Sequence, residues 1–305
     1  MSGATYGIAA AILLGTNTIL IAIAARRWGV WRTTASTLVI AYFVLILYAV
    51  LTQDAFPLDA GGLWPLMAVL GFAAGSSYFA GNQALKMGPV SVVSPIGSTT
   101  GVMTVLFAFV FLGERPDMIQ WLGIPLAGLG VVLLSFEQDE SGQRRLVGLG
   151  PLFALVGVVT GAISNAGLQI PAREIGPVST AIAQRTFTVF YVLLALVFVV
   201  RKQGDESDAL ELKRWQVTRG HPGDTRLGIR PWLMLTLLGV LDAAAFILFA
   251  NGLAIADAWL IGLLSQSGRI IAVAGGYVLF KERLGPTQWL GLGLSLVGLT
   301  LVVIA

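Results

Sequence analysis

The segment FLGERPDMIQWLGIPLAGLG at residues 111–130 returns as LFKERLGPTQWLGLGLSLVG at residues 279–298. In both copies a Glu-Arg pair precedes a Gln-Trp-Leu-Gly sequence at the same spacing. The correspondence extends backwards without a gap, so that residues 71–130 align with residues 239–298. A shared register over this length favours an internal duplication over chance.

Apolar residues dominate the whole chain, which has 305 residues, 56% of them hydrophobic and only 11% charged. A helix that crosses a bilayer needs about 20 mostly apolar residues. The apolar runs are continuous and lack alternation, which indicates helices rather than barrel strands. The sequence therefore predicts an all-α integral membrane protein with ten transmembrane helices, near residues 4–25, 33–52, 63–86, 90–112, 118–136, 148–171, 178–200, 231–254, 258–280 and 287–305.

The duplication divides these spans into two repeats of five, at residues 1–137 and 148–305. Because five is odd, the second repeat is expected to cross the membrane upside down relative to the first. Inverted repeats are an architecture with which many membrane carriers build two gates around one central site. A long polar connection at residues 201–230 interrupts the second repeat.

Basic residues predict how the chain is oriented. Most Lys and Arg residues between spans follow the odd-numbered spans, and only Arg115 and Arg173 lie on the other side. The positive-inside rule then predicts a multi-pass protein of the cell membrane, with both termini extracytoplasmic and the 201–230 loop cytoplasmic. The first apolar run lacks the basic start of a cleavable signal peptide, so we expect it to remain as a span.

The composition also limits which cofactors and partners the protein is expected to have. The chain has no cysteine and a single histidine, His221, so neither a metal site nor another cofactor is predicted. The net charge of +3 comes from residues that border the spans, which favours contact with lipid over nucleic acid. The expected partners are the lipid bilayer and a small-molecule substrate. We expect a monomer, although small residues in the last span of each half leave a homodimer open.

Several motifs resemble those of a known family. Residues 88–95 (GPVSVVSP), 111–115 (FLGER) and 120–123 (QWLG), followed by GLGV at 128–131, look like an EamA domain. Two such domains in tandem resemble a ten-helix member of the drug/metabolite transporter superfamily. The resemblance implies transport of amino acids, other small metabolites, nucleotide sugars, amines or drugs. The second half departs from the pattern at residues 257–259 and at Lys281, so the resemblance does not name a substrate.

Three ionisable residues lie deep within predicted spans: Arg185, Asp242 and Arg269. A charge at mid-depth costs about 3 kcal/mol or more, so such residues face a wet cavity or a partner. We expect all three to line a substrate site, where the arginines suit a carboxylate or phosphate and Asp242 could bind an ammonium group or carry a coupling proton. The alternative is a structural ion pair between Asp242 and Arg269.

Uncharged polar and aromatic residues within the spans complete the predicted substrate site: Asn17, Tyr78, Asn82, Asn165, Gln169, Gln184, Trp259 and Gln266. Each of them alone is more often an interhelical contact. The Glu114-Arg115 pair at the end of the fourth span is interpreted first as a clamp that holds a tight turn, with a gating role as the alternative.

The favoured function is secondary active transport by alternating access. The first choice of substrate is an amino-acid-like or other carboxylate-bearing metabolite, moved outward and coupled to protons through Asp242. No Walker phosphate loop is present. An organic cation or drug carrier is the alternative, and a lipid scramblase a more distant one. An enzyme is not expected, because the spans hold one deep carboxylate and no deep histidine.

Overall fold

The computed structural model describes residues 2–52, 61–87, 90–115, 117–134, 149–203, 229–279 and 285–304. Within these ranges the regular structure is helical, without strands. The helices are α1 (Gly3–Trp28), α2 (Val30–Thr52), η2 (Gly61–Leu63), α3 (Trp64–Met87), α4 (Val90–Phe107), η3 (Ala108–Leu112), α5 (Met118–Leu134), α6 (Gly150–Gly167), α7 (Gln169–Glu174), α8 (Pro177–Gln203), α10 (Ile229–Ile255), α11 (Ala258–Ser267), α12 (Arg269–Leu279) and α13 (Pro286–Ile304).

Two of the predicted spans are broken helices. The predicted helix 148–171 consists of α6 and the short α7, which meet at Leu168. The predicted helix 258–280 consists of α11 and α12, which meet at Gly268. A Cβ atom at Gly268 would come within 1.8 Å of the Ala11 carbonyl oxygen, so α1 packs directly against the backbone of this break. The predicted helix 90–112 ends in the π-helical turn η3.

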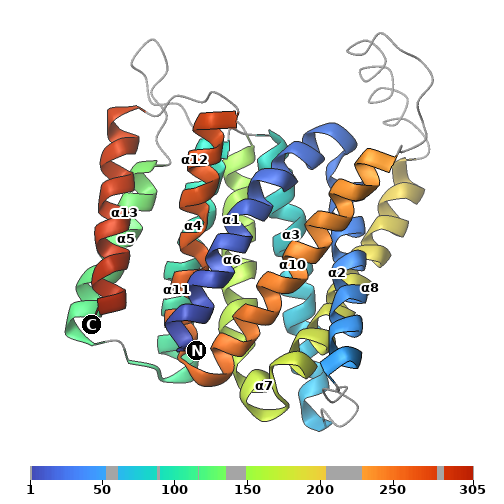
Figure 1. Cartoon of the computed structure of the whole chain (residues 1–305), viewed down its shortest axis with the longest axis horizontal. Helices are drawn as coiled ribbons and strands as arrows, with labels where there is room; N and C mark the ends of the chain where they lie inside the picture. Colours follow the sequence, from blue (N-terminus) through green and yellow to red (C-terminus); the bar gives the residue numbers. More distant parts are fainter. Residues whose placement is uncertain are drawn as a thin grey trace.

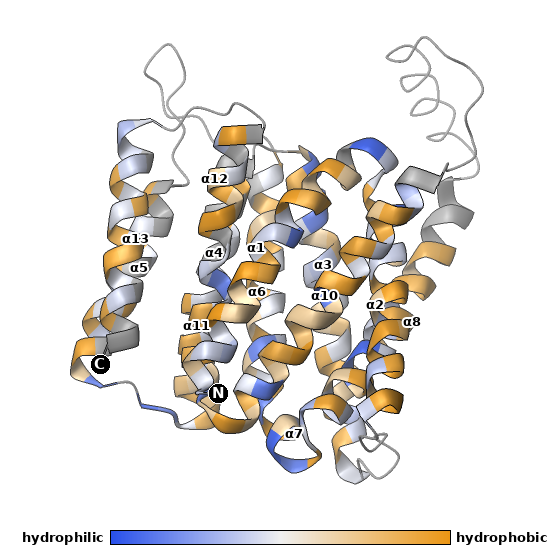
Figure 2. Ribbon diagram, in the orientation of Figure 1, coloured by the Kyte–Doolittle hydropathy of each residue, from blue (hydrophilic) through white to orange (hydrophobic). Residues whose placement is uncertain are grey.

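Seven of the described helical segments are long and apolar enough to cross a membrane, and three more apolar helices are shorter. Large apolar side chains such as Phe43, Phe72 and Phe190 are exposed on the outside of the protein. Hydrophobic residues run along the long helices, and hydrophilic residues gather mainly at helix ends and around α7 (Figure 2). The fold is therefore that of an all-helical, multi-pass membrane protein. The predicted connection 201–230 lies mostly outside the described residues.

The helices pack in two groups that each combine elements of both halves. In the first bundle, α3 packs on α6 and α8, and α4 packs on α6. In the second bundle, α10 packs on α1 and α2, and α11 and α12 pack on α1. Exchange of the two sequence halves converts each helix pairing of one bundle into a helix pairing of the other bundle. The pairing of α3 with α6, for example, corresponds to that of α10 with α1. The packing is thus nearly symmetric with respect to the duplication.

The last helices of the two halves, α5 and α13, pack on each other at one end of the molecule (Figure 1). A Cβ atom at Gly130 of α5 would lie 2.3 Å from the backbone nitrogen of Ser295 in α13, so the two backbones touch there. Both chain termini lie at the same edge of the molecule as α7 (Figure 1). We call this edge the terminal side and the opposite edge the connection side.

Candidate functional site

A cavity of about 180 Å³ lies between the two bundles. Helices α3, α4, α6 and α8 of the first bundle and α1, α10 and α11 of the second contribute to its wall. Among the described lining residues, Asp242 is the only Asp, Glu, Lys or Arg side chain. Seven of the predicted substrate-site residues line it: Asn17, Tyr78, Asn82, Asn165, Gln184, Asp242 and Gln266.

The cavity extends from mid-depth towards the connection side. Leu85 near the end of α3, Val93 near the start of α4 and Ala154 near the start of α6 belong to its wall, and all three lie towards that side. On the terminal side the lining stops at Leu14 of α1 and Phe249 of α10, well short of the ends of those helices, and only on α6 does it reach close to the helix end, at Asn165. The hollow is therefore displaced towards one face of the molecule.

A buried ion pair backs the cavity at mid-depth. Arg185 Nη2 of α8 lies 2.8 Å from Asp242 Oδ2 of α10, and the two side chains are 0% and 1% exposed. The contact has ion-pair distance but not hydrogen-bond alignment, and Arg185 Nε and Nη1 have no hydrogen-bond partner. The Tyr78 hydroxyl of α3 donates to Asp242 Oδ1 at 2.8 Å. Asp242 of the second bundle is thus held by two residues of the first.

Two aromatic rings enclose the Arg185 guanidinium. Its central carbon lies 5.1 Å from the centre of the Tyr78 ring and 4.6 Å from the centre of the Phe246 ring. Cation–π attraction at such distances stabilises a desolvated guanidinium. Tyr78 and Phe246 occupy equivalent positions in the duplicated sequence. Sequence reasoning did not select Phe246, although its equivalence to Tyr78 could have found it.

Amide side chains in the cavity wall present unpaired acceptors. Gln184 Nε2 donates to Ser164 Oγ at 3.1 Å, while Gln184 Oε1 is buried without a partner. Asn17 Oδ1 is likewise buried and unpaired. Buried carbonyl oxygens without donors carry a desolvation cost that a bound donor or water would relieve. Asn82, in contrast, uses its amide nitrogen to donate to Thr34 Oγ1 of α2 at 2.7 Å.

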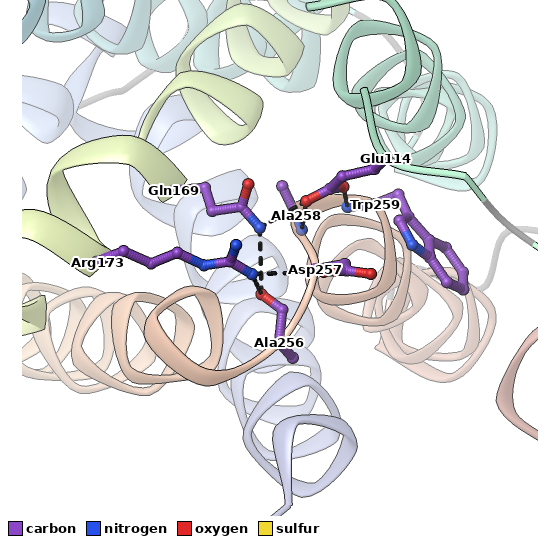
Figure 3. Close-up of polar contacts among 7 residues, drawn as sticks. All are labelled: Glu114, Gln169, Arg173, Ala256, Asp257, Ala258 and Trp259. Carbon is purple, nitrogen blue, oxygen red and sulfur yellow. Dashed lines mark hydrogen bonds and ion pairs between the residues drawn. The ribbon is translucent and has the colours of Figure 1, made fainter. Parts of the chain in front are cut away.

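A second polar group, which we call the terminal-side cluster, joins the bundles beyond the cavity (Figure 3). Glu114, in the segment after α4, accepts hydrogen bonds from the backbone N–H groups of Ala258 and Trp259 at 3.0 and 3.1 Å. Gln169 Nε2 of α7 also donates to Glu114, and it lies 3.3 Å from the Ala256 carbonyl oxygen.

The remaining contacts of the cluster come from Arg173 of α7. Its Nη2 donates to the Ala256 carbonyl oxygen at 3.1 Å and lies 3.4 Å from Asp257 Oδ1. Arg173 and Asp257 are about half exposed, so their ion pair is weak. Together, the contacts of Glu114, Gln169 and Arg173 attach α7 and the end of α4 to the turn between α10 and α11.

Several residues that the sequence placed in the substrate site lie elsewhere in the structure. Gln169 and the backbone of Trp259 belong to the terminal-side cluster and do not line the cavity. Glu114, which we interpreted first as a clamp of its own turn, reaches across to α11. Arg185 lies behind the wall rather than in it. The described ion-pair partner of Asp242 is Arg185, and the Arg269 side chain lies outside the described residues. Among the described residues, no three His, Asp or Glu side chains are grouped to hold a metal ion.

A polar cavity between two nearly symmetric helical bundles is an arrangement that many membrane transport proteins share. The family model of the EamA-like transporter family matches residues 1–136 and again residues 148–304. The chain therefore belongs to the EamA-like transporter family, and the resemblance found in the sequence is confirmed. This membership points to a transporter rather than to an enzyme.

Individual relatives agree with the family but do not name a substrate for this chain. An uncharacterized transporter in the cobO 3′ region of Sinorhizobium sp is 33% identical over 106 residues, which is 34% of this chain and 75% of the relative. A probable magnesium transporter, NIPA9 of Arabidopsis thaliana, is 30% identical over 94 residues, but the match spans only 27% of that protein and 30% of this chain. A solved crystal structure with 18% sequence identity has a TM-score of 0.67 over 97% of both chains, so the two share a fold.

Proposed function

We propose that this protein is a secondary transporter that carries small polar solutes across the cell membrane by alternating access. The observation that carries the proposal is the cavity between the two bundles, which has one buried carboxylate, Asp242, in its wall. Transporter sites with inverted repeats lie at mid-depth between the repeats. A buried charge within a span is by default a functional group.

The proposed topology has ten spans in two inverted repeats. The seven long apolar helices, together with the shorter apolar helices Thr99–Leu112, Trp121–Gly130 and Trp289–Gly298, supply the ten crossings. An even number of crossings agrees with the two termini at one edge (Figure 1). The exchange of packing partners between the halves supports the inversion. By the distribution of Lys and Arg, the terminal side is extracytoplasmic and the connection side cytoplasmic.

The position of the polar contacts between the bundles supports alternating access. The cavity lies towards the connection side, and the terminal-side cluster bridges the bundles at the other end. In this arrangement a solute would reach Asp242 from the cytoplasm and leave after the bundles have moved apart on the terminal side. Export, the direction expected from the sequence, would begin from such a state, and it is the direction we propose.

The chemistry of the wall favours a solute without net charge. Arg185 already neutralises Asp242, so the described part of the wall offers no free counter-ion to a permanent cation, which disfavours the organic-cation alternative. The unpaired oxygens of Asn17 and Gln184 accept hydrogen bonds, and an amino or ammonium group supplies them. A carboxylate would compete with Asp242 for the Arg185 guanidinium. An amino-acid-like zwitterion carries both the amino group that can donate to these oxygens and the carboxylate that can bind the guanidinium.

Proton coupling is proposed to run through Asp242. Protonation of this carboxylate would remove its attraction for Arg185, and a movement of the Asp242 side chain would then let the substrate carboxylate reach the guanidinium behind the wall. The side chain already contacts both Tyr78 and Arg185, so one proton would alter both of its contacts between the bundles.

The test is solute movement in vesicles that contain only the purified protein. A panel of amino acids, neutral metabolites and a quaternary amine is first screened for thermal stabilisation, because a ligand of the native state raises the melting temperature. Stabilising solutes are then measured in counterflow, beside a lipid-scrambling assay. Counterflow of a zwitterion without lipid movement supports the proposal. Movement of lipid without solute, or of the quaternary amine alone, rejects it.

A further inference from the structure

The N-terminus of α11 has a cap from a distant part of the chain. Asp257 occupies the N-cap position with extended backbone angles (φ −73°, ψ 144°), yet its side chain makes no capping hydrogen bond. Instead, the Glu114 carboxylate, 144 residues away in sequence, binds the N–H group of Ala258 and also that of Trp259. A carboxylate at a helix N-terminus satisfies free N–H groups and complements the helix dipole.

Asp257 is placed to replace this cap. Its carboxylate contacts Arg173 at 3.4 Å, in a pair whose side chains are 46% and 53% exposed and therefore well screened by solvent. Aspartate at the N-cap normally accepts from the second or third N–H group of the helix, here Trp259 or Leu260. The residue thus has the right type, position and backbone conformation to cap α11 once Glu114 has left.

We propose that the terminal-side cluster is a gate that opens by exchange of helix caps. In the closed state Glu114 caps α11 and ties the end of α4 to the second bundle, as Figure 3 shows. In the open state Glu114 withdraws with the first bundle, and Asp257 turns away from Arg173 to cap α11. The exchange keeps the helix N-terminus capped in both states, so opening leaves few unsatisfied backbone groups.

This inference rests on the proposed function, because a gate presupposes a cavity that opens to both sides. The cap exchange predicts that substitutions of two acidic residues in the same cluster have opposite effects. Removal of the Glu114 charge destabilises the closed state, whereas truncation of Asp257 destabilises the open state. If the two acids only stabilised one static structure, both substitutions would act in the same direction.

The absence of cysteine from the sequence allows a direct test with a single introduced thiol. Ser265, a buried cavity residue of α11, is replaced in Ser265→Cys, and its reaction with a membrane-impermeant maleimide is timed in right-side-out and inside-out vesicles. A separate Ser2→Cys variant identifies the vesicles that present the terminal side. The measured quantity is the ratio of the labelling rates from the terminal and connection sides.

Glu114→Gln is expected to raise this ratio roughly fivefold, and Asp257→Ala to lower it by a similar factor, since loss of one cap shifts a two-state equilibrium by about that much. Glu174→Gln, which removes an exposed charge at the end of α7, should leave the ratio unchanged. Shifts of both variants in one direction, or no shift in either, would overturn the cap exchange. If Glu114→Gln does not fold, the labelling ratio of Asp257→Ala alone tests the proposal: a lower ratio supports it, and an unchanged or higher ratio overturns it.

The outcome separates the gate from the transport proposal. Opposite shifts in a protein that moves no solute from the panel would support the gate and reject the proposed function. Counterflow with unmoved labelling ratios would reject the gate and retain the function.

Discussion

Arg185 and Asp242 form an ion pair 2.8 Å long in which neither side chain has appreciable contact with solvent. Both residues belong to the second half of the sequence, and the equivalent positions of the first half hold Leu38 and Ala74. The duplication thus supplies a natural uncharged pair at the equivalent positions. This asymmetry permits substitutions that separate the structural from the functional role of the charges.

Removal of one partner should destabilise the protein strongly. Arg185→Leu or Asp242→Ala leaves the other charge buried without compensation, and we expect a loss of about 3–5 kcal/mol. The double variant Arg185→Leu/Asp242→Ala should recover most of that loss but carry no solute. Melting temperatures and counterflow of all three variants check this. A double variant that transports normally would assign the pair a purely structural role.

Tyr78→Phe removes the hydroxyl that donates to Asp242 and gives position 78 the residue of its repeat counterpart, Phe246. The ring over Arg185 remains, but a buried carboxylate oxygen loses its donor, so the free energy of unfolding should fall by about 2–3 kcal/mol. If Asp242 carries the coupling proton, uphill transport and its pH dependence should change more than downhill flux. An unchanged pH dependence would argue against a contribution of the hydroxyl to coupling.

Gln184→Met retains a long side chain but loses the unpaired oxygen in the cavity wall. We expect the dissociation constant of a stabilising solute with an amino group to rise roughly fivefold, which corresponds to about 1 kcal/mol for one hydrogen bond. The same solute without its amino group should bind both proteins equally. Titration calorimetry with this solute pair tests the assignment, and an equal loss for both solutes contradicts it.

Gly268→Ala tests the close contact between α1 and the break in the ninth predicted span. The new Cβ would collide with the Ala11 carbonyl oxygen, a backbone atom that cannot move aside alone. We expect a loss of about 3 kcal/mol or more, measured as melting temperature and membrane yield. Gly293→Ala is the matched control, because its Cβ would meet nothing within 4 Å and should leave the protein as stable or slightly more so. Equal melting temperatures of the two variants would contradict the packing.

The sequence predicted the positions of most helices because each apolar run is long and is bounded by polar residues. It did not predict the breaks at Leu168 and Gly268, because Leu168 is itself apolar and the polar residues next to Gly268 were interpreted as part of a substrate site. The break at Leu168 carries Gln169 out of the cavity wall and into the terminal-side cluster. Helix breaks therefore decided which polar residues share a site.

Pairing between helices was harder to predict than the helices themselves. Asp242, Arg185 and Arg269 were recognised as unusual because charges within spans are expensive. Which arginine would meet Asp242 depends on how α8 and α10 rotate against each other, and apolar composition leaves that rotation undetermined. The reach of Glu114 to α11 had no local signal either, because it joins residues 144 positions apart.

Counterflow in vesicles that contain only this protein tests the transport proposal most directly. Vesicles preloaded with an unlabelled zwitterion that stabilises the protein should take up the labelled solute transiently against its gradient, and Arg185→Leu/Asp242→Ala vesicles should not. Equal uptake by vesicles with the wild-type chain, the double variant and no protein, for every solute that stabilises the chain, would contradict a substrate site between the two bundles.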